Sequence, residues 1–379
     1  MTDRFYLTKA PPVRRLWVAV FLAYLAFGGT LQLLPATLST RFHSDAAFIG
    51  LTVGIAFAAT ALCRPIAGWA GDAGAGRRIV IMGAALTLAG TLGQGLAATE
   101  WQLLVSRVVM GAGEAGVFSG ALPWVWRQVP PHKRGSASGL FGLSMWSGLA
   151  IGPLVASIAV LGGQHVAWLA LAALSLGSLA VATATTASGR VRLPRFTLEA
   201  LWVRGMAAPS VMFGLTAYGY GTLSAVLVLY LDSGPGGSSL GLPVFAVAFL
   251  LVRVTGSRLV DRAGGRVVAA ASLIVEAVGF AVIIAAGTAA GVLVGVALVG
   301  AGCSLAFPAA VGMAIARSPH HAAGSSVAGM TSFWDLGILT AGVGAGILAE
   351  ALDFRSAFVA ALAAALLALI VAVSMPSHP

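Results

Sequence analysis

The sequence predicts an all-helical membrane protein whose transmembrane helices form two pseudo-symmetric six-helix bundles. Three observations lead to this fold class: a very apolar composition, a series of apolar segments of membrane-spanning length, and an internal repeat. Of the 379 residues, 59% are apolar and 9% are charged, whereas soluble domains hold roughly 45–50% apolar and about 25% charged residues. This composition excludes a water-soluble globular enzyme.

The apolar segments set the number of predicted helices. One crossing of a bilayer core of about 30 Å takes about 20 apolar residues in a helix. Twelve such segments occur, at residues 16–38, 47–70, 79–98, 102–124, 136–160, 166–186, 206–231, 238–259, 267–287, 290–315, 325–348 and 357–375. The connections are short and leave no room for a catalytic domain outside the membrane, so we do not expect an enzyme.

The basic residues indicate how the chain is oriented. The net charge is +10, and with the N-terminus inside, seventeen of the 22 basic residues fall in cytoplasmic segments, against Arg41 and Arg355 outside. The positive-inside rule then predicts an inner-membrane protein with both termini in the cytoplasm. The charge is therefore explained by topology, and we expect no nucleic-acid partner. The two cysteines, Cys63 and Cys303, fall inside predicted helices and form no disulfide framework.

An internal repeat divides the chain. A shift of 189 residues brings sparse residue types onto themselves: Arg64 onto Arg253, Asp72 onto Asp261, Arg77 onto Arg266, Pro130 onto Pro319, and Gly148 onto Gly337. Matches of Arg, Asp and Pro in order are not expected by chance, so the two halves are homologous. We predict an N-terminal six-helix bundle at residues 1–188, a cytoplasmic linker at 189–205 and a C-terminal six-helix bundle at 206–379. Parallel repeats of this kind are typical of alternating-access transporters.

The loop after the second predicted helix carries a family resemblance. It reads Gly68-Trp-Ala-Gly-Asp72-Ala-Gly-Ala-Gly76-Arg77-Arg78, and the second half repeats it as Arg258-Leu-Val-Asp261-Arg262-Ala-Gly264-Gly265-Arg266. This pattern resembles the loop signature of the major facilitator superfamily, and the resemblance covers essentially the whole chain. It implies the two-bundle fold of that family and a substrate cavity lined by helices one, four, seven and ten.

The resemblance also implies gate residues. Asp72 and Asp261 would each meet the N-terminus of a helix from the other half, and Arg77 and Arg266 would pair with these carboxylates. Such contacts are worth roughly 0.3 to 1 kcal/mol each and would favour the outward-open state. The alternative is a solvated loop of turn residues and positive-inside anchors. Arg64 and Arg253 lie near the predicted cytoplasmic helix ends, where long side chains reach the interface, and we interpret them as gate and anchor residues.

Ionisable residues inside predicted helices are the sharper functional signal, because they are costly in a bilayer. Arg107, Gly111, Glu114 and Phe118 form one stripe of the fourth helix. The run from Arg107 to Gly113 resembles the fourth-helix motif of the superfamily, in which the arginine is tied to proton coupling. Because seven residues rise about 10.5 Å, we expect Glu114 and Arg107 to couple through water, substrate or another helix. A structural ion pair is the alternative.

Two further acids lie inside predicted helices. Asp335, in the eleventh helix, falls on Trp146 under the repeat, and a charge gained in one half alone is difficult to explain as scaffold. Proton or cation binding by Asp335 and hydrogen bonding to neighbouring hydroxyls are both open. Glu276 is on helix nine, which the resemblance makes peripheral, so we favour a structural or interhelical role for it.

Small residues and polar groups complete the predicted sites. Gly148, Gly152 and Pro153 resemble the front half of the antiporter motif of drug:proton exchangers, and they permit close helix approach and a bend. We assign them to the conformational gate. The predicted substrate-binding residues are Tyr24, Gln32, Phe118, Trp146, Tyr218, Phe307 and Asp335.

These observations favour a monomeric proton-driven exporter of small amphipathic compounds, neutral or cationic. Within the helices deep acids outnumber the deep base Arg107 by three to one, and aromatic faces with a carboxylate suit organic cations. The proton gradient would serve in place of a cofactor, and we predict no metal site. A proton symporter or facilitator that imports a small metabolite shares the same scaffold. A sensor or lipid-handling protein would not need Arg107, Glu114 and Asp335 inside the bilayer.

Overall fold

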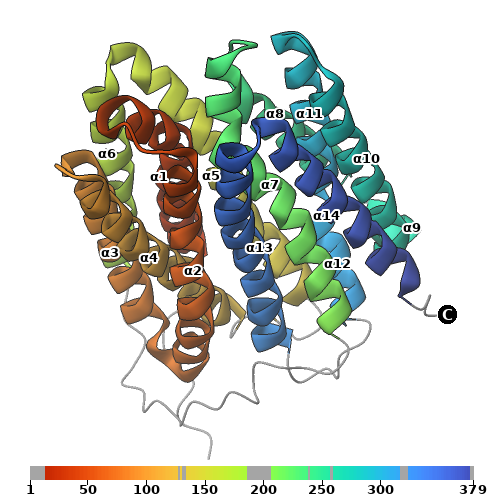
Figure 1. Ribbon diagram of the computed structural model, residues 1–379. Coiled ribbons are helices and arrows are strands. Elements are labelled where there is room, and N and C mark those ends of the chain that lie inside the picture. Colours follow the sequence, from red (N-terminus) through yellow and green to blue (C-terminus); the bar gives the residue numbers. More distant parts are fainter. Residues whose placement is uncertain are drawn as a thin grey trace, which may run out of the picture.

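The computed structural model describes residues 13–126, 129, 134–185, 206–237, 240–256, 259–315 and 323–375, and throughout these ranges the secondary structure is helical. Figure 1 shows the helices packed as one bundle. The N-terminal half contains α1 (Val13–Thr37), η1 (Leu38–Phe42), α2 (Ala46–Ala70), η2 (Gly71–Ala75), α3 (Gly76–Leu96), α4 (Glu100–Trp126), α5 (Arg134–Ala159), η4 (Val160–Gly162) and α6 (Gln164–Thr183). The C-terminal half contains α7 (Ala207–Ser233), α8 (Gly241–Gly256), α9 (Leu259–Ala263), α10 (Gly265–Ala285), α11 (Ala289–Ser304), α12 (Ala306–Ile315), α13 (Ala323–Ala351) and α14 (Phe354–Ser374).

The predicted membrane-spanning segments coincide with these helices. Among the described residues, ten segments are long and apolar enough to cross a membrane, one of them the 51-residue stretch Ala46–Leu96 that holds both α2 and α3. The shorter apolar helix α8 accounts for the remaining predicted span. The all-helical, multi-pass prediction is therefore confirmed. The predicted linker at 189–205 lies outside the described residues.

Gly74 divides the long stretch Ala46–Leu96 into two helices. It has φ of 97°, in the left-handed region that glycine adopts without a steric penalty. The chain can therefore reverse between α2 and α3 within a short segment. This turn belongs to the loop signature identified in the sequence.

The internal repeat is visible in the helix packing. A methyl group on Gly111 of α4 would overlap the backbone of Ala56 on α2, and one on Gly300 of α11 would overlap the backbone of Phe245 on α8. These two close approaches are separated by the same 189 residues in both partners. Small residues let helix backbones approach in this way, so equivalent glycines fix equivalent helix pairs in the two halves.

The glycines predicted for the gate pack α5 against α1. A methyl group on Gly148 would lie 2.7 Å from the carbonyl oxygen of Phe21, and one on Gly152 would lie 2.5 Å from the amide nitrogen of Gly29. Pro153 lies inside α5 and cannot donate to the carbonyl of Leu149. The predicted close helix approach is present, and it lies within the N-terminal half.

The two halves meet where α2 packs against α13, which Figure 1 shows side by side. A methyl group on Gly50 would overlap the backbone of Gly342, and one on Gly346 would lie 2.6 Å from the carbonyl oxygen of Ala46. Glu350 of α13 also accepts a hydrogen bond of 3.0 Å from the amide of Ala47, at the start of α2. A carboxylate suits a helix N-terminus, so this end of the interface is closed by both packing and charge.

A proline explains the break between α11 and α12 at Leu305. Pro308 has no amide hydrogen, so the carbonyl of Ser304 loses its partner within the helix. Arg253 of α8 supplies the missing donor, with 2.7 Å between Nη1 and the Ser304 oxygen. The guanidinium of Arg253 also stacks over the ring of Phe307, 5.6 Å from its centroid. Arg253 is thus 6% exposed and stabilises a helix break, so the prediction that its side chain reaches the interface was wrong.

Candidate functional site

A buried charge cluster joins three helices at the centre of the bundle. Arg64 of α2 donates from Nε to Oδ2 of Asp335 on α13 at 2.5 Å, and from Nη2 to Oε1 of Glu114 on α4 at 3.1 Å. A second contact runs from Nη2 to Oδ1 of Asp335 at 3.2 Å. These are the two side-chain ion pairs found in the described part of the chain. We name Arg64, Glu114 and Asp335 the charge cluster.

Arg64 lies deeper than the sequence suggested. We predicted it near the cytoplasmic end of its helix with its side chain at the interface, but it is 2% exposed and contacts both acids. The helix ends at Ala70 as predicted, but the Arg64 side chain turns into the bundle, where it pairs with both carboxylates. The placement at the interface was wrong, and the residue belongs to the central site.

Neighbouring groups on α2 support the cluster. The Thr60 hydroxyl lies 3.0 Å from Oε2 of Glu114 and 2.9 Å from the carbonyl oxygen of Gly111. Pro65 cannot donate to the carbonyl of Ala61, and Ser332 of α13 contacts that carbonyl at 3.4 Å. Pro65 thus leaves a carbonyl of the first half free to accept from Ser332 of the second half.

A small cavity opens onto the charge cluster. It is lined by Tyr24, Phe57, Arg64, Glu114, Met145, Trp146, Leu149, Thr331, Trp334 and Asp335, and its volume is about 10 Å³, close to the space that one water needs. Three polar atoms of its lining lack a hydrogen-bond partner in the described structure: the Tyr24 hydroxyl, Arg64 Nη1 and Trp146 Nε1. Buried polar groups are normally satisfied, so this cavity has unused hydrogen-bonding capacity.

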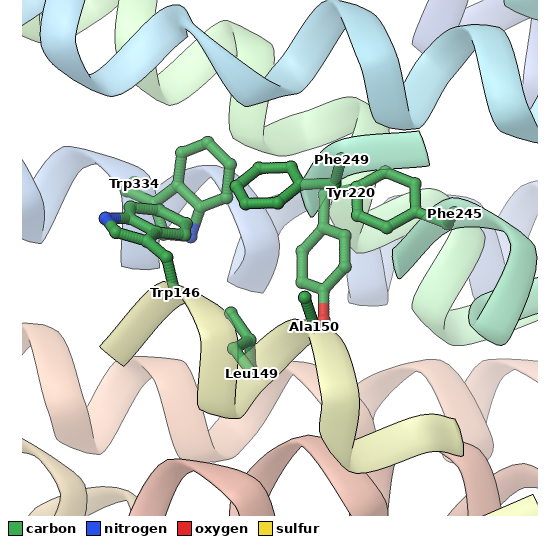
Figure 2. Close-up of a pocket in the computed structure, with 7 residues that line it drawn as sticks. All are labelled: Trp146, Leu149, Ala150, Tyr220, Phe245, Phe249 and Trp334. Carbon is green, nitrogen blue, oxygen red and sulfur yellow. The ribbon is translucent and has the colours of Figure 1, made fainter. Parts of the chain in front are cut away.

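A second cavity of about 10 Å³ lies next to the first and is aromatic. Trp146, Leu149, Ala150, Tyr220, Phe245, Phe249 and Trp334 line it. Figure 2 shows Tyr220 extending toward Ala150, with the two indoles on the opposite side. The rings of Trp146 and Trp334 meet edge to face with centroids 4.8 Å apart. Because Trp146, Leu149 and Trp334 line both cavities, a polar region and an aromatic region are continuous.

The repeat relates several residues of the central site in one half to residues of a different type in the other half. A shift of 189 takes Arg64 to Arg253, Thr60 to Phe249, Met145 to Trp334 and Trp146 to Asp335, and it takes Glu114 to Cys303. The arginine is kept in both halves, whereas the two acids of the charge cluster have Cys303 and Trp146 as counterparts. The acidic groups of the central site are therefore not shared between the two halves.

Arg107 has partners other than carboxylates. Its guanidinium donates to the Thr30 hydroxyl at 2.9 Å and to the carbonyl of Val53 at 3.1 Å, and it lies 4.9 Å from the centroid of Phe27. Glu114 pairs with Arg64 instead. The structure therefore agrees with the predicted separation of Arg107 and Glu114. Arg107, at 0% exposure, connects α4 to α1 and α2.

The predicted substrate-binding residues fall into two groups. Tyr24, Trp146 and Asp335 line the central cavities, and Phe118 and Phe307 pack directly behind them, with centroids 6.3 Å from Tyr24 and 5.6 Å from Trp146 respectively. Two others lie elsewhere. Tyr218 points toward Gly344 of α13, and Gln32 is buried with Oε1 unpartnered, outside both cavity linings.

The predicted gate arginines contact helix ends within their own halves. Arg77 donates from Nε to the carbonyl of Thr185 at 2.8 Å and from Nη2 to that of Thr183 at 3.1 Å, at the end of α6. Arg266 likewise donates to the carbonyl of Val373 near the end of α14. We expected both to pair with carboxylates, but cations also suit helix C-termini. Asp72 lies exposed in η2, whereas the side chain of Asp261 falls outside the described part.

Sequence reasoning missed several lining residues. Trp334, Phe245, Phe249 and Thr331 line the cavities, and all four are on α8 or α13 rather than on the helices expected to line the path. A usable signal was present for one of them, because Trp334 directly precedes Asp335. For the others the hydrophobic pattern of a membrane helix does not separate cavity from packing positions.

Comparisons with known proteins agree with this architecture. The family model described as Major Facilitator Superfamily matches residues 16–232 and 209–379. The MFS-type transporter STM4428 of Salmonella typhimurium is 33% identical over 365 residues, which are 93% of each chain. The MFS-type transporter YhhS of Escherichia coli K12 is 28% identical over 342 residues, covering 86% of this chain and 83% of the relative.

A solved structure shares the fold. A crystal structure of a variant of the nucleoside transporter NupG superposes with a TM-score of 0.72 and covers 96% of this chain and 99% of its own. Its sequence is 13% identical, so this likeness concerns the arrangement of helices.

Proposed function

Since the chain belongs to the Major Facilitator Superfamily and is a membrane transporter of that type, we propose that it exchanges protons for small amphipathic compounds, neutral or cationic, and exports them by alternating access. The observation that carries this proposal is the charge balance of the cluster. One guanidinium, that of Arg64, faces two carboxylates, those of Glu114 and Asp335, at the meeting place of the two halves.

The charge balance favours binding of a positive charge. With all three groups ionised the cluster carries one net negative charge, which is expensive away from water. A proton on either carboxyl, or a cationic group of a substrate in the cavity, would neutralise it. A proton and a cationic substrate then compete to neutralise the same negative charge. An exchanger requires such competition.

Thr60 gives the cluster a group that responds to protonation. A hydroxyl holds one hydrogen, so Thr60 can donate to Oε2 of Glu114 or to a backbone carbonyl, but not to both at once. With Glu114 ionised, Thr60 donates to it. With Glu114 protonated, the carboxyl can donate and Thr60 can turn to Gly111. Protonation of Glu114 therefore changes the hydrogen bonding of Thr60 where α2 meets α4.

The aromatic cavity supports an amphipathic substrate. The rings of Trp146, Trp334, Tyr220, Phe245 and Phe249 surround a space beside the charge cluster, and such rings bind apolar bodies and stabilise cations. Because each cavity has room for about one water, the halves must separate before a substrate can enter. We assign this conformation to an occluded stage with the outer end of α2 and α13 closed, in a monomer of the inner membrane with cytoplasmic termini.

Proton flux in proteoliposomes tests the proposal. Purified protein is reconstituted under an imposed pH gradient with a pH-sensitive dye, and amphipathic monocations, neutral antibiotics, nucleosides and sugars are added as probes. We expect an amphipathic probe to collapse the gradient with wild type and not with Glu114→Gln or Asp335→Asn. The exposed acid Asp232 supplies the matched control, since Asp232→Asn should behave as wild type. Flux of a probe without proton movement, or unimpaired Glu114→Gln, would contradict proton-coupled exchange.

Import of a small metabolite is the second candidate. The unused donors Arg64 Nη1 and Trp146 Nε1 would suit an acceptor-rich solute, and a structure of the same fold belongs to a nucleoside transporter. The same vesicles separate the two functions. A nucleoside or sugar that enters together with protons identifies a symporter, and one that equilibrates without moving protons identifies a facilitator.

A further inference from the structure

Glu276 is a buried acid that the central site does not use. It lies on α10 with 0% exposure, and neither carboxyl oxygen has a hydrogen-bond partner in the described structure. A carboxylate with neither a donor nor a cation is strongly disfavoured in a membrane interior. The neutral acid avoids most of that penalty. Its environment therefore favours the protonated form.

The surrounding helices leave a defined space for this carboxyl. A methyl group on Gly219 of α7 would overlap Oε1 of Glu276, so glycine at that position makes room for the acid. The thiol of Cys303 on α11 lies beside the carboxyl. The ring of Phe280 borders Gly219 on the same side. The acid is enclosed by glycine, thiol and aromatic groups.

The titratable groups around Glu276 are few. Cys303 faces it from α11, and on α7 the tyrosines Tyr218 and Tyr220 flank Gly219, whose position borders the carboxyl. The described parts of α12 and α14 that pack against α10 contribute apolar side chains there, apart from Arg355 at the far end of α14. Arg266 lies ten residues away along α10, which is about 15 Å. No cation in the described structure is therefore placed to stabilise an ionised Glu276.

The internal repeat shows that the first half has no acid at the position equivalent to Glu276. Glu276 and Cys303 correspond to Thr87 and Glu114 in the other half. The backbone contacts are equivalent, because a methyl group on Gly113 would lie 2.5 Å from the Thr87 amide nitrogen and one on Gly302 would lie 2.6 Å from the Glu276 amide nitrogen. Each half thus has one acid where this pair of helices meets. The acid is Glu114 on α4 in the first half and Glu276 on α10 in the second.

We infer that Glu276 is a second proton-binding site, located inside the C-terminal half and separate from the charge cluster. Its ligand is a proton held on the carboxyl between α7, α10 and α11. This site lies next to the central cavity, since Gly219, whose position borders the Glu276 carboxyl, directly precedes Tyr220 of the aromatic cavity. The site does not depend on the proposed exchange mechanism, because its occupancy follows from its own surroundings.

Infrared spectroscopy of the whole protein in lipid nanodiscs tests the assignment. A protonated carboxyl has a C=O stretching band that the carboxylate lacks. We expect wild type to show such a band at neutral and mildly alkaline pH, and we expect Glu276→Gln to lose it. Glu114→Gln should retain it, which distinguishes this site from the charge cluster. Proton titration should count one proton fewer for Glu276→Gln than for wild type.

A second variant covers the possibility that Glu276→Gln does not fold. Cys303→Ser keeps the acid and replaces the thiol by a stronger donor of nearly the same size, so the band should move to lower frequency. The inference is overturned if wild type shows no such band, or if Glu276→Gln leaves it in place. It is also overturned if Cys303→Ser leaves the band unmoved. Each of these results is independent of proton flux through Glu114 and Asp335.

Discussion

Arg64 Nε and Asp335 Oδ2 lie 2.5 Å apart and join α2 of the first half to α13 of the second. Because Arg64 also holds Glu114 on α4, the interface between the halves and the interior of the first half share one guanidinium. Any change in the charge of either acid therefore alters a contact between the two halves. This is the physical link between proton binding and helix movement that the proposed exchange requires.

Removing Arg64 should cost more stability than removing the whole cluster. Arg64→Met leaves two buried carboxylates without their cation, and breaking a buried ion pair from one side typically costs about 3–5 kcal/mol. The triple variant Arg64→Met, Glu114→Gln, Asp335→Asn removes the unpaired charges and should regain much of that loss. Unfolding in detergent by heat or denaturant measures the difference. Lower pH should reduce the difference in unfolding free energy between Arg64→Met and the triple variant, because protonation neutralises the unpaired acids.

If Arg64→Met were as stable as the triple variant, the guanidinium of Arg64 would not be needed to balance the negative charges of Glu114 and Asp335. Arg64→Lys offers a matched comparison, since it retains the charge and loses the planar two-sided geometry. It should fall between wild type and Arg64→Met.

The contact between Gly50 and Gly342 should control closure of the end of the pathway that the proposed topology places outside. Gly50→Val cannot fit, because even a methyl group there would overlap the backbone of Gly342. We expect the outer ends of α2 and α13 to stay apart and transport to be lost. Spin labels at these two ends should report a longer distance than in wild type. Gly287→Ala is the control, since a methyl group at Gly287 meets nothing within 4 Å. Equal distances in Gly50→Val and wild type would contradict this role.

The fold could be predicted from the sequence because its evidence is local. Apolar length gives each span, and the repeat at 189 residues pairs equivalent helices, as the contacts of Gly111 and Gly300 show. Spacing along one helix also separated Glu114 from Arg107. These inferences need only a helical geometry and a chain compared with itself.

The assembly of the charge cluster could not be predicted in the same way. Arg64 and Asp335 are 271 residues apart in sequence, and which helices cross is decided by packing between the halves. Arg64 also stands close enough to the loop signature to look like an interfacial anchor. Likewise, the partners of Arg77 and Arg266 are backbone carbonyls. Every helix end has such carbonyls, so the residue types in the sequence do not reveal which ones an arginine contacts.

Arg77 and Arg266 should contribute similarly to the stability of their own halves. Arg77 donates to two carbonyl groups at the end of α6, and Arg266 donates to one near the end of α14, the sixth long helix of its half. Losing such contacts at a partly exposed helix end should cost about 1 kcal/mol. We expect Arg77→Ala and Arg266→Ala to lower unfolding stability by comparable amounts, and the double variant to be additive. Strong non-additivity would instead indicate that both arginines act in one contact between the halves.

Arg107 should be required for its hydrogen-bond geometry as well as for its charge. It holds the Thr30 hydroxyl and the Val53 carbonyl at the same time, and lysine cannot reproduce this fork. Arg107→Lys should therefore lower stability, while Thr30→Val, which removes one partner of a charged donor, should cost about 1.5–3 kcal/mol. Unfolding measurements on both variants test this. If Arg107→Lys is as stable as wild type, the positive charge alone suffices and the fork geometry is not required.

Trp146 should separate substrate binding from proton coupling. It lines both cavities and contacts Trp334, Phe249 and Phe307, but it carries no charge. Trp146→Ala removes much of the aromatic wall and should weaken binding of an amphipathic probe about tenfold or more, as loss of a buried aromatic contact of about 1.5 kcal/mol or more implies. Trp146→Phe should retain most of the affinity.

Proton coupling in these Trp146 variants should differ from that in the acid variants. At saturating probe concentration, Trp146→Ala should still move protons with each probe molecule, because Arg64, Glu114 and Asp335 are intact. Glu114→Gln should show the reverse pattern, with the probe bound and no proton moved. Equilibrium dialysis, which does not rely on tryptophan fluorescence, measures binding of the probe. Proton flux in vesicles measures coupling. If Trp146→Ala loses coupling even at saturation, the indole is part of the coupling site, and the division of the cavity into a charged side and an aromatic side is wrong.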